Sequence, residues 1–417
     1  MTSRYPGYGS TELSEGAMRR RFAQAGRAGN SRWLWPELAV EHWQSSLESI
    51  AAVTGDVLAG KQRPHLAGRA EALGIAGYTS GMGPVLGFWL AEGAITADAE
   101  AAGVLETHFT HNRDRMAKLA GHAAEISAGF ARKGVQGTVL KGMDTAFACF
   151  PDPGARPMSD IDLLVAPDDE AAANEVLAGL GYVAGRVNTL PPARNWRMPA
   201  SPQLPRTLTF VHAQDPWSVD LQTSLNRRAG AHEVELDCCL RRKPLRRSER
   251  FPALHTLPPA ALVLHLACHA SCTLESLSLL RLLELVLVVR QSRQAEPGLW
   301  DDVLEIANGS EVLSFTYPAF RLSEALAPGT VPDGVQERCR AAATAAVRRV
   351  VDRLSPARAQ SQGRCSLEER FMWNRSCLLT ARQVLREMVP PGSSSIPALL
   401  AIYRNRVRRV AHGTVTR

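Results

Sequence analysis

Two aspartates separated by a single residue are the clearest chemical feature of this sequence. Asp160 and Asp162 lie in the run Ser159–Val165, whose apolar residues predict a strand buried in a sheet. Because successive side chains of a strand point to opposite faces, both carboxylates should project side by side from one face. Neighbouring carboxylates raise each other's pKa unless a cation lies between them, and Mg²⁺ prefers such oxygen ligands. The pair therefore predicts a divalent metal site; the alternative is a strand whose solvent face carries two aspartates.

A Lys-Gly pair lies one predicted helix before this strand. The β-rich run Thr138–Leu140 ends at Lys141 and Gly142, and a helical run over Met143–Phe150 follows. The free N–H groups and the positive dipole end of such a helix start favour an anion, glycine allows close approach to the backbone, and lysine adds a charge. The pair predicts a phosphate-binding turn; the alternative is an ordinary turn capped by Asp144.

A third carboxylate belongs to Asp220, in the β-like run Ser218–Leu221. A site with two metal ions about 3.5–4 Å apart needs at least one carboxylate more than the pair supplies. If this strand is a neighbour of the first, Asp220 completes a set of three. Taken alone, a single strand aspartate is more typical of a turn or a surface.

The elements that must position these residues are short strands between long helices. Strands are predicted at the runs named above and at Leu208–His212, and helical stretches alternate with them. Later helices are predicted over Ala260–Gln291, over Leu299–Ala327 with a break at Pro318, and over Glu368–Glu387. The pattern predicts an α+β protein with a small sheet-containing core flanked by N- and C-terminal helical regions.

The chain divides into five predicted regions. The first thirty or so residues show no sustained periodicity, which predicts a mobile tail. In order, the regions are the tail (1–32), a helical region (33–134), the core (135–235), a second helical region (236–330) and a helical and basic region (331–417).

Composition limits the classes of protein and partner. Of the 417 residues, 45% are hydrophobic and 21% are charged, which excludes a globally disordered or fibrous chain. A net charge of +7 favours an anionic partner such as a nucleotide, a polyphosphate or a nucleic acid. The eight cysteines form no Cys-x-x-Cys pair, as expected for reduced thiols in the cytoplasm. The most apolar stretch, Leu277–Val289, contains Arg281 and Glu284, so no membrane span is expected.

Two further groups of residues invite a binding interpretation. His265, Cys268, His269 and Cys272 share one helix face, but their spacing along a straight helix prevents all four from reaching one metal ion. We expect helix packing there or, for the histidines, contact with the site. The basic stretches 241–250 and 404–409 lack interleaved aromatic residues, so we expect solvated surface rather than a single-strand platform for nucleic acid.

Together these motifs resemble a known family. The sequence shows Leu140-Lys141-Gly142, then Arg156, the Asp160–Val165 strand, Leu180-Gly181-Tyr182 and Val219-Asp220-Leu221, in that order. This order resembles the uncharacterised nucleotidyltransferase family of the polymerase β-like superfamily. The resemblance extends to further residues and covers most of the chain after residue 35; these residues are Asn112, Arg113, His265, His269, Arg281, Glu284, Tyr403 and Arg404.

The resemblance implies a mixed-sheet, polymerase β-like core and a set of roles. Asp160 and Asp162 would bridge two Mg²⁺ ions, and Asp220 would hold the ion near the acceptor and help to deprotonate it. An acceptor would attack the α-phosphate of a nucleoside triphosphate, and pyrophosphate would leave. The residues implied to contact phosphates are Lys141, Gly142 and either Ser159 or Arg156. Arg156 has an equal alternative role as an ion-pair partner that orders the preceding loop.

The sequence thus predicts a magnesium-dependent nucleotidyltransferase whose acceptor is unidentified: a small molecule, a peptide, a protein side chain or an RNA end. One alternative is a non-catalytic, antitoxin-like or regulatory binding module with the same fold. Another is a protein that modifies RNA ends or binds nucleic acid. If it only binds nucleic acid, through its arginine clusters, the aspartates would be dispensable.

Overall fold

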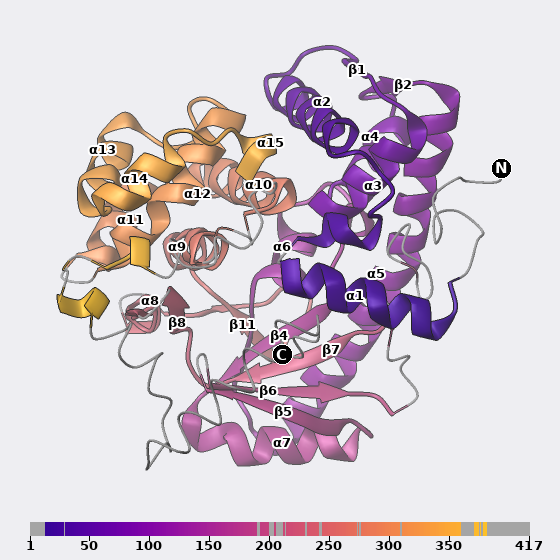
Figure 1. Ribbon diagram of the computed structural model, residues 1–417. Coiled ribbons are helices and arrows are strands. Elements are labelled where there is room, and N and C mark those ends of the chain that lie inside the picture. The colour runs from indigo at the N-terminus through magenta and orange to yellow at the C-terminus, as the bar shows by residue number, and fades with distance from the viewer. Residues whose placement is uncertain are drawn as a thin grey trace, which may run out of the picture.

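The computed structural model describes most of the chain between residues 13 and 381. Within these limits it leaves undescribed residues 29, 190–191, 200–203, 206–211, 213, 230–231, 242–243, 273, 275–276, 309–310, 360–370, 375 and 377. In Figure 1 the twisted sheet lies in the lower part of the view. The N-terminal helices lie above it at the right, and the later helices lie above it at the left.

The N-terminal region is helical, as predicted. Its elements are α1 (Glu15–Ala28), η1 (Ser31–Leu34), α2 (Val40–Leu58), α3 (Ala70–Ser80), α4 (Gly83–Ala91) and α5 (Ala99–Lys133), with a short parallel pair of strands, β1 (His65–Leu66) and β2 (Thr96–Ala97). The long helix α5 ends at Gly134, whose φ of 68° suits a glycine.

The predicted mobile tail is wrong for residues 15–28, which form α1. Met18 on this helix is buried in the N-terminal core. Arg21 donates a hydrogen bond to the Leu34 carbonyl at 2.6 Å and pairs with Glu37 at 2.7 Å. These contacts supplement a short apolar face, because Met18, Phe22 and Ala25 follow helical spacing along α1 and pack in the N-terminal core.

The core is a sheet in which the structure describes seven strands, in the order β10-β11-β3-β4-β7-β6-β5. Strand β4 lies antiparallel to β3 and parallel to β7, so the sheet is mixed. The bounds are β3 (Gly137–Val139), β4 (Asp160–Val165), β5 (Val183–Thr189), β6 (Pro192–Arg197), β7 (Ser218–Gln222), β10 (Arg246–Arg247) and β11 (Leu254–Thr256). The α+β class with flanking helices is therefore confirmed.

The two faces of β4 have different environments. Ile161 and Leu163, together with Val219 and Leu221 of β7, pack into the core that includes Phe130 of α5. The opposite face carries Asp160, Asp162 and Leu164, and Leu164 packs with the later helices. Shorter elements around the sheet are α6 (Lys141–Ala148), η2 (Pro153–Ala155), η3 (Pro167–Asp169) and α7 (Glu170–Gly179). The sheet thus buries its apolar face and presents the aspartates on the other.

The C-terminal part begins with a separate hairpin and continues as helices. Its elements are β8 (Arg227–Ala229), β9 (His232–Val234), α8 (Cys238–Arg241), α9 (Pro259–Ser271), α10 (Leu279–Ala295), α11 (Leu299–Ala307), α12 (Val312–Leu326), α13 (Asp333–Ala342), α14 (Ala345–Val351) and α15 (Pro356–Ala359). In the part of the chain that the structure describes, no helix combines the length and the apolar character that crossing a membrane requires.

Three details of the later region differ from the sequence predictions. The helix predicted over 260–291 is interrupted between α9 and α10, where Ser278 caps α10. Pro318 does not break a helix: it lies inside α12, and the N–H of Ala319 donates to Ser271 Oγ at 3.0 Å. Strand β11 of residues 236–330 also joins the core sheet, although this region was expected to be helical.

Some predicted elements fall on residues that the structure does not describe. The strand at 208–212 lies there except for His212, as does most of the helix at 368–387. The basic segment 404–409 lies wholly outside the described residues.

Candidate active site

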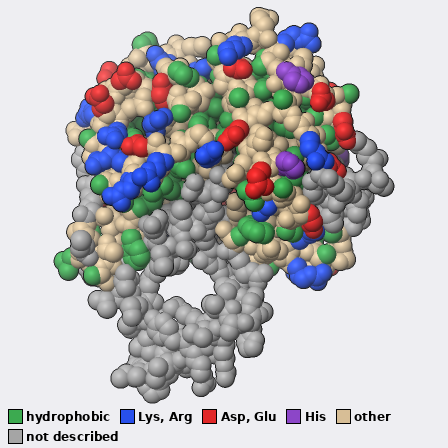
Figure 2. Space-filling model, turned by 45° about the horizontal axis from the view of Figure 1, so that its top comes forward, with side chains coloured by type: hydrophobic (Ala, Val, Ile, Leu, Met, Phe, Trp, Pro, Cys, Tyr) green, Lys and Arg blue, Asp and Glu red, His purple; other side chains and the backbone are tan. Residues whose placement is uncertain are grey.

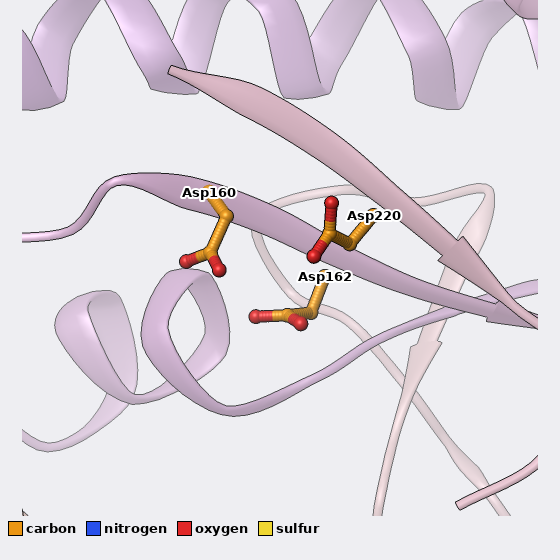
Figure 3. Close-up of side chains that lie close together, drawn as sticks. All are labelled: Asp160, Asp162 and Asp220. Atoms are coloured by element: carbon orange, nitrogen blue, oxygen red, sulfur yellow. The ribbon is translucent and has the colours of Figure 1, made fainter. Parts of the chain in front are cut away.

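Three aspartates meet on the face of the sheet that is turned toward the later helices. Asp160 and Asp162 come from β4, and Asp220 comes from the neighbouring strand β7, where it is the register partner of Asp162. One carboxylate oxygen from each residue lies within 4.8 Å of the others (Figure 3). This convergence follows from the alternation of side chains along β4 and from the parallel pairing with β7. Paired residues of neighbouring strands point to the same face, so Asp220 lies on the face that carries Asp160 and Asp162.

The local environment opposes the ionisation of Asp162 and Asp220. Asp162 is only 5% exposed, and burial raises its pKa to about 6, with Lys141 opposing and Asp160 adding to the rise. Burial also raises the pKa of Asp220, although a hydrogen bond from Asn195 Nδ2 at 2.6 Å favours the charged form. A divalent cation among the three oxygens would remove this repulsion.

The donor set fits magnesium. All three residues offer hard carboxylate oxygens, which Mg²⁺ prefers over nitrogen or sulfur ligands. Among the described residues, no other group of three or more His, Cys, Asp or Glu side chains is close enough to share an ion. The histidines and cysteines of α9 accordingly form no such cluster.

Lys141 is the cation nearest to the aspartates. Its Nζ lies 3.0 Å from Asp162 Oδ2 and donates to His269 Nε2 at 2.7 Å. Burial and the neighbouring Lys141 hold the pKa of His269 well below its usual range, so this imidazole is a neutral acceptor. The Lys141 backbone has a φ of 25°, a region that residues other than glycine rarely occupy. Two side-chain contacts thus hold Lys141 at the start of α6 in a sparsely populated conformation.

His265, one turn earlier in α9, is fully buried. Neither of its ring nitrogens has a hydrogen-bond partner among the described residues. The site contact expected of the two histidines is therefore made by His269.

Gly142 and Arg156 are packed against each other. A Cβ atom at Gly142 would lie 2.8 Å from Nη1 of Arg156, so the guanidinium occupies the space of a side chain. Arg156 donates from Nε and Nη2 to the two carboxylate oxygens of Glu284, each at 2.9 Å. Thr145 donates to the same carboxylate. The structure thus shows the ion-pair role of Arg156; its contact with a phosphate stays a prediction, and Arg156 also lines the cavity over the aspartates.

Glu284 stays ionised although it is buried. Burial alone would raise its pKa, but Arg156 and the hydrogen bonds from Arg156 and Thr145 outweigh burial and lower the pKa below its usual value. Gly142 therefore packs against a buried ion pair, which joins Arg156 of the core to Glu284 of α10.

Arg115 of α5 is a structural feature of the site that the sequence reasoning missed. It is 2% exposed and donates to the carbonyl of Met158, at 3.0 Å, just before β4. It also donates to the carbonyls of Asp215 at 2.6 Å and Pro216 at 2.9 Å, just before β7. One guanidinium thus joins the two loops that lead into the aspartate strands.

A signal for Arg115 was present in the sequence. His108, Asn112 and Arg115 follow helical spacing on the same side of α5 as Leu105 and Leu119, so polar residues interrupt an apolar face. A buried polar side chain needs a partner, and Asn112 likewise donates to the Gly154 carbonyl at 2.6 Å.

A cavity of about 250 Å³ lies over this arrangement. Lys141, Gly142, Ser159, Asp160 and Asp162 line it on the core side. The other wall comes from α9 and α10 and includes His269, Arg281 and Glu284. The cavity combines acidic residues for a cation with cations and a helix start for an anion, which suits a metal-bound phosphate.

A mixed sheet with three carboxylates on adjacent strands and a Lys-Gly helix start beside them defines the class: a nucleotidyltransferase. The family model of the uncharacterised nucleotidyltransferases matches residues 93–328, more than half of the chain. The protein therefore belongs to this family, as the resemblance predicted. The comparisons with curated proteins and with solved structures found no match.

Proposed function

We propose that the protein transfers a nucleoside monophosphate from a nucleoside triphosphate to an acceptor, using two Mg²⁺ ions on a polymerase β-like core. The convergence of Asp160, Asp162 and Asp220 beside the Lys141–Gly142 turn is the observation that carries this proposal. It supplies the carboxylates for the metal and the cation and helix start for the phosphates in one cavity.

The residues divide between metal and phosphate. Asp160 and Asp162 would hold both ions, and Asp220 would hold the one nearer the acceptor. When bound, the ions would neutralise charge on the α-phosphate and favour the ionised form of the attacking hydroxyl. The Asp220 carboxylate, on the acceptor side of the site, would take the acceptor's proton.

Lys141 and Ser159 would contact the phosphates. The Lys141 ammonium, held by His269, would donate to the oxygens of the leaving pyrophosphate. The exposed Ser159 lines the cavity beside Asp160 and can donate its hydroxyl to a phosphate oxygen. Arg156 would act indirectly: its ion pair with Glu284 fixes the position of the guanidinium group against which Gly142 packs.

A test of this function needs to distinguish nucleotidyl transfer from phosphoryl transfer. The purified protein is incubated with Mg²⁺, panels of small-molecule, peptide and RNA acceptors, and triphosphates labelled at either the α- or the γ-phosphorus. We expect the α-label on the acceptor and the γ-label in pyrophosphate. Label from the γ-position on the acceptor would instead indicate a kinase and refute the proposal.

Matched substitutions test the metal mechanism. Asp160→Asn should abolish transfer, because it removes one charge of the metal site while keeping the side-chain volume. Asp168→Asn is the control, since Asp168 lies exposed beyond the other end of β4 and should leave activity unchanged. Full turnover by the Asp160→Asn protein would contradict the mechanism.

The alternatives receive less support from the described residues. A binding module without a metal would gain nothing from placing three carboxylates together, two of which, Asp162 and Asp220, are opposed in their ionisation by burial. On the face in Figure 2, basic side chains gather at one side but acidic side chains lie among them. Arg340 of α13, for example, pairs with Asp352 at 2.9 Å. Such a surface is typical of solvated ion pairs rather than of a nucleic-acid groove.

A further inference from the structure

The cavity over the aspartates is small for a whole nucleotide. Its volume is about 250 Å³, whereas sites for small molecules usually measure about 300–1,000 Å³. A triphosphate that extends from the Lys141–Gly142 turn to Asp160 uses this space. The nucleoside must therefore lie outside it, in an adjoining space.

A second hollow of about 450 Å³ adjoins this cavity. Its size falls within the range expected for a small-molecule site. Six residues line both spaces; they are Pro157, Met158, Ser159, Ser278, Leu280 and Arg281. The two spaces therefore adjoin beside the first aspartate of β4, and the passage that our proposal requires runs along these shared residues.

The walls of the second hollow combine flat apolar surfaces with polar groups. The Tyr78 ring, Pro216 and Leu280 provide apolar surface, and Asp215 and Arg281 provide polar groups. A nucleobase has the same division, with two apolar faces and a polar edge.

The walls are also fixed in place. Tyr78 packs edge-on against Trp35, with ring centroids 5.2 Å apart. Arg115 holds the loop that carries Asp215 and Pro216 through the backbone bonds described above. The hollow is therefore preformed rather than assembled on binding.

The direction of transfer separates the nucleoside from the acceptor. In an in-line displacement, the attacking and leaving oxygens lie on opposite sides of the α-phosphorus. The pyrophosphate side faces Lys141 and Gly142, next to β3. The attacking side then faces Asp220 on β7, which lies on the other side of β4 in the sheet. The passage past Ser159 and Arg281 is a third direction, open to the nucleoside.

On the basis of the proposed function, we propose that the hollow between α3, α10 and the loop before β7 binds the nucleoside of the triphosphate, with its base against Tyr78. Arg281 lies in the passage, where the α-phosphate and the ribose meet. The N-terminal helical region thus contributes to nucleotide binding through the end of α3.

The test compares two ligands that share the phosphates and differ in the nucleoside. Isothermal titration calorimetry with Mg²⁺ measures the Kd of inorganic tripolyphosphate and of ATP, GTP, CTP and UTP. Tyr78→Ala removes the ring, and Tyr78→Phe keeps the ring and serves as the control. Loss of a base contact to an aromatic ring commonly weakens binding about tenfold or more.

We expect Tyr78→Ala to weaken the best-bound nucleoside triphosphate about tenfold, with tripolyphosphate affected less than about twofold. Tyr78→Phe should stay close to the wild type, whereas Lys141→Met should weaken both ligands. An equal change for both ligands in the Tyr78→Ala protein, including no change, would overturn the inference while leaving the proposed function intact. A wild-type protein that binds neither ligand would instead contradict the proposed function itself.

Discussion

Replacing Glu284 with glutamine should destabilise the whole core around the site. Glu284 is 2% exposed, and its two carboxylate oxygens accept the paired hydrogen bonds from Arg156 at 2.9 Å. Arg156 is itself only 8% exposed. Glutamine has nearly the same volume but no charge and only one acceptor oxygen. The substitution therefore leaves a buried guanidinium without its counter-charge.

The magnitude follows from burial. Removing one partner of a buried ion pair costs about 3–5 kcal/mol, whereas an exposed pair contributes about 0–1 kcal/mol. The pair of Lys133 and Glu175 provides the matched control, because its atoms are 3.0 Å apart but its side chains are 54% and 66% exposed. We expect Glu284→Gln to lower the free energy of unfolding by about 3 kcal/mol or more, and Glu175→Gln by less than about 1 kcal/mol.

Urea unfolding at pH 7, followed by tryptophan fluorescence and circular dichroism, compares the two variants. Because Arg156 packs on Gly142, Glu284→Gln should also raise the Kd for tripolyphosphate, and Glu175→Gln should not. The pKa of Glu284 is lowered in the folded protein, so its contribution is present above its ordinary pKa of 4.5 and is lost as the pH falls through the lower folded value. If both variants unfold at the same urea concentration at pH 7, the reasoning about the buried pair is wrong.

Three other substitutions test separate parts of the electrostatic description. Burial and Glu284 raise the pKa of Asp144 from 3.8 to about 7, so the free energy of unfolding of the wild type should fall by on the order of 4 kcal/mol as the pH rises from 3.8 to 7. The Asp144→Asn protein should lack this contribution. Parallel plots of melting temperature against pH for the two proteins would contradict the expectation. Arg115→Lys cannot serve all its carbonyl acceptors, so transfer should drop at least about tenfold while the fold survives; unchanged activity would argue against its role. In chelator at pH 8, Asp162→Asn should melt higher than the wild type, because the wild-type Asp162 carboxylate, with a pKa of about 6, ionises at a cost to the fold. A lower melting temperature would count against this explanation. Without chelator, the variant should bind Mg²⁺ more weakly than the wild type.

The aspartate site could be predicted because its signal is local. The alternation in β4 places Asp160 and Asp162 on one face by strand geometry alone, and the observed strand begins at Asp160. The neighbouring position of β7 is not a local property. The sequence named Asp220 as a third carboxylate, but only the register of β4 with β7 places it opposite Asp162.

The missed elements lack a local signal. Strands β5 and β6 pair near the sheet edge, and β5 leaves Val183 and Val187 exposed, so no regular alternation of buried and exposed residues marks them. Strand β11 has three residues and is recruited by β3, more than a hundred residues earlier. Short strands of this kind are defined by their partner rather than by their own sequence.

The position of the aspartate strand depends on helices from both sides of the core. The loop before β4 is tied to α5 through Arg115, which bonds the Met158 carbonyl, and to α10 through Arg156, which pairs with Glu284. The cavity over the aspartates likewise takes His269 from α9. A segment cut at residues 135–235 would therefore retain all three aspartates but lose Arg115 and Glu284, which hold their loops, and His269, which accepts from Lys141. In this protein the flanking helices are part of the active-site framework as well as the walls of its pockets.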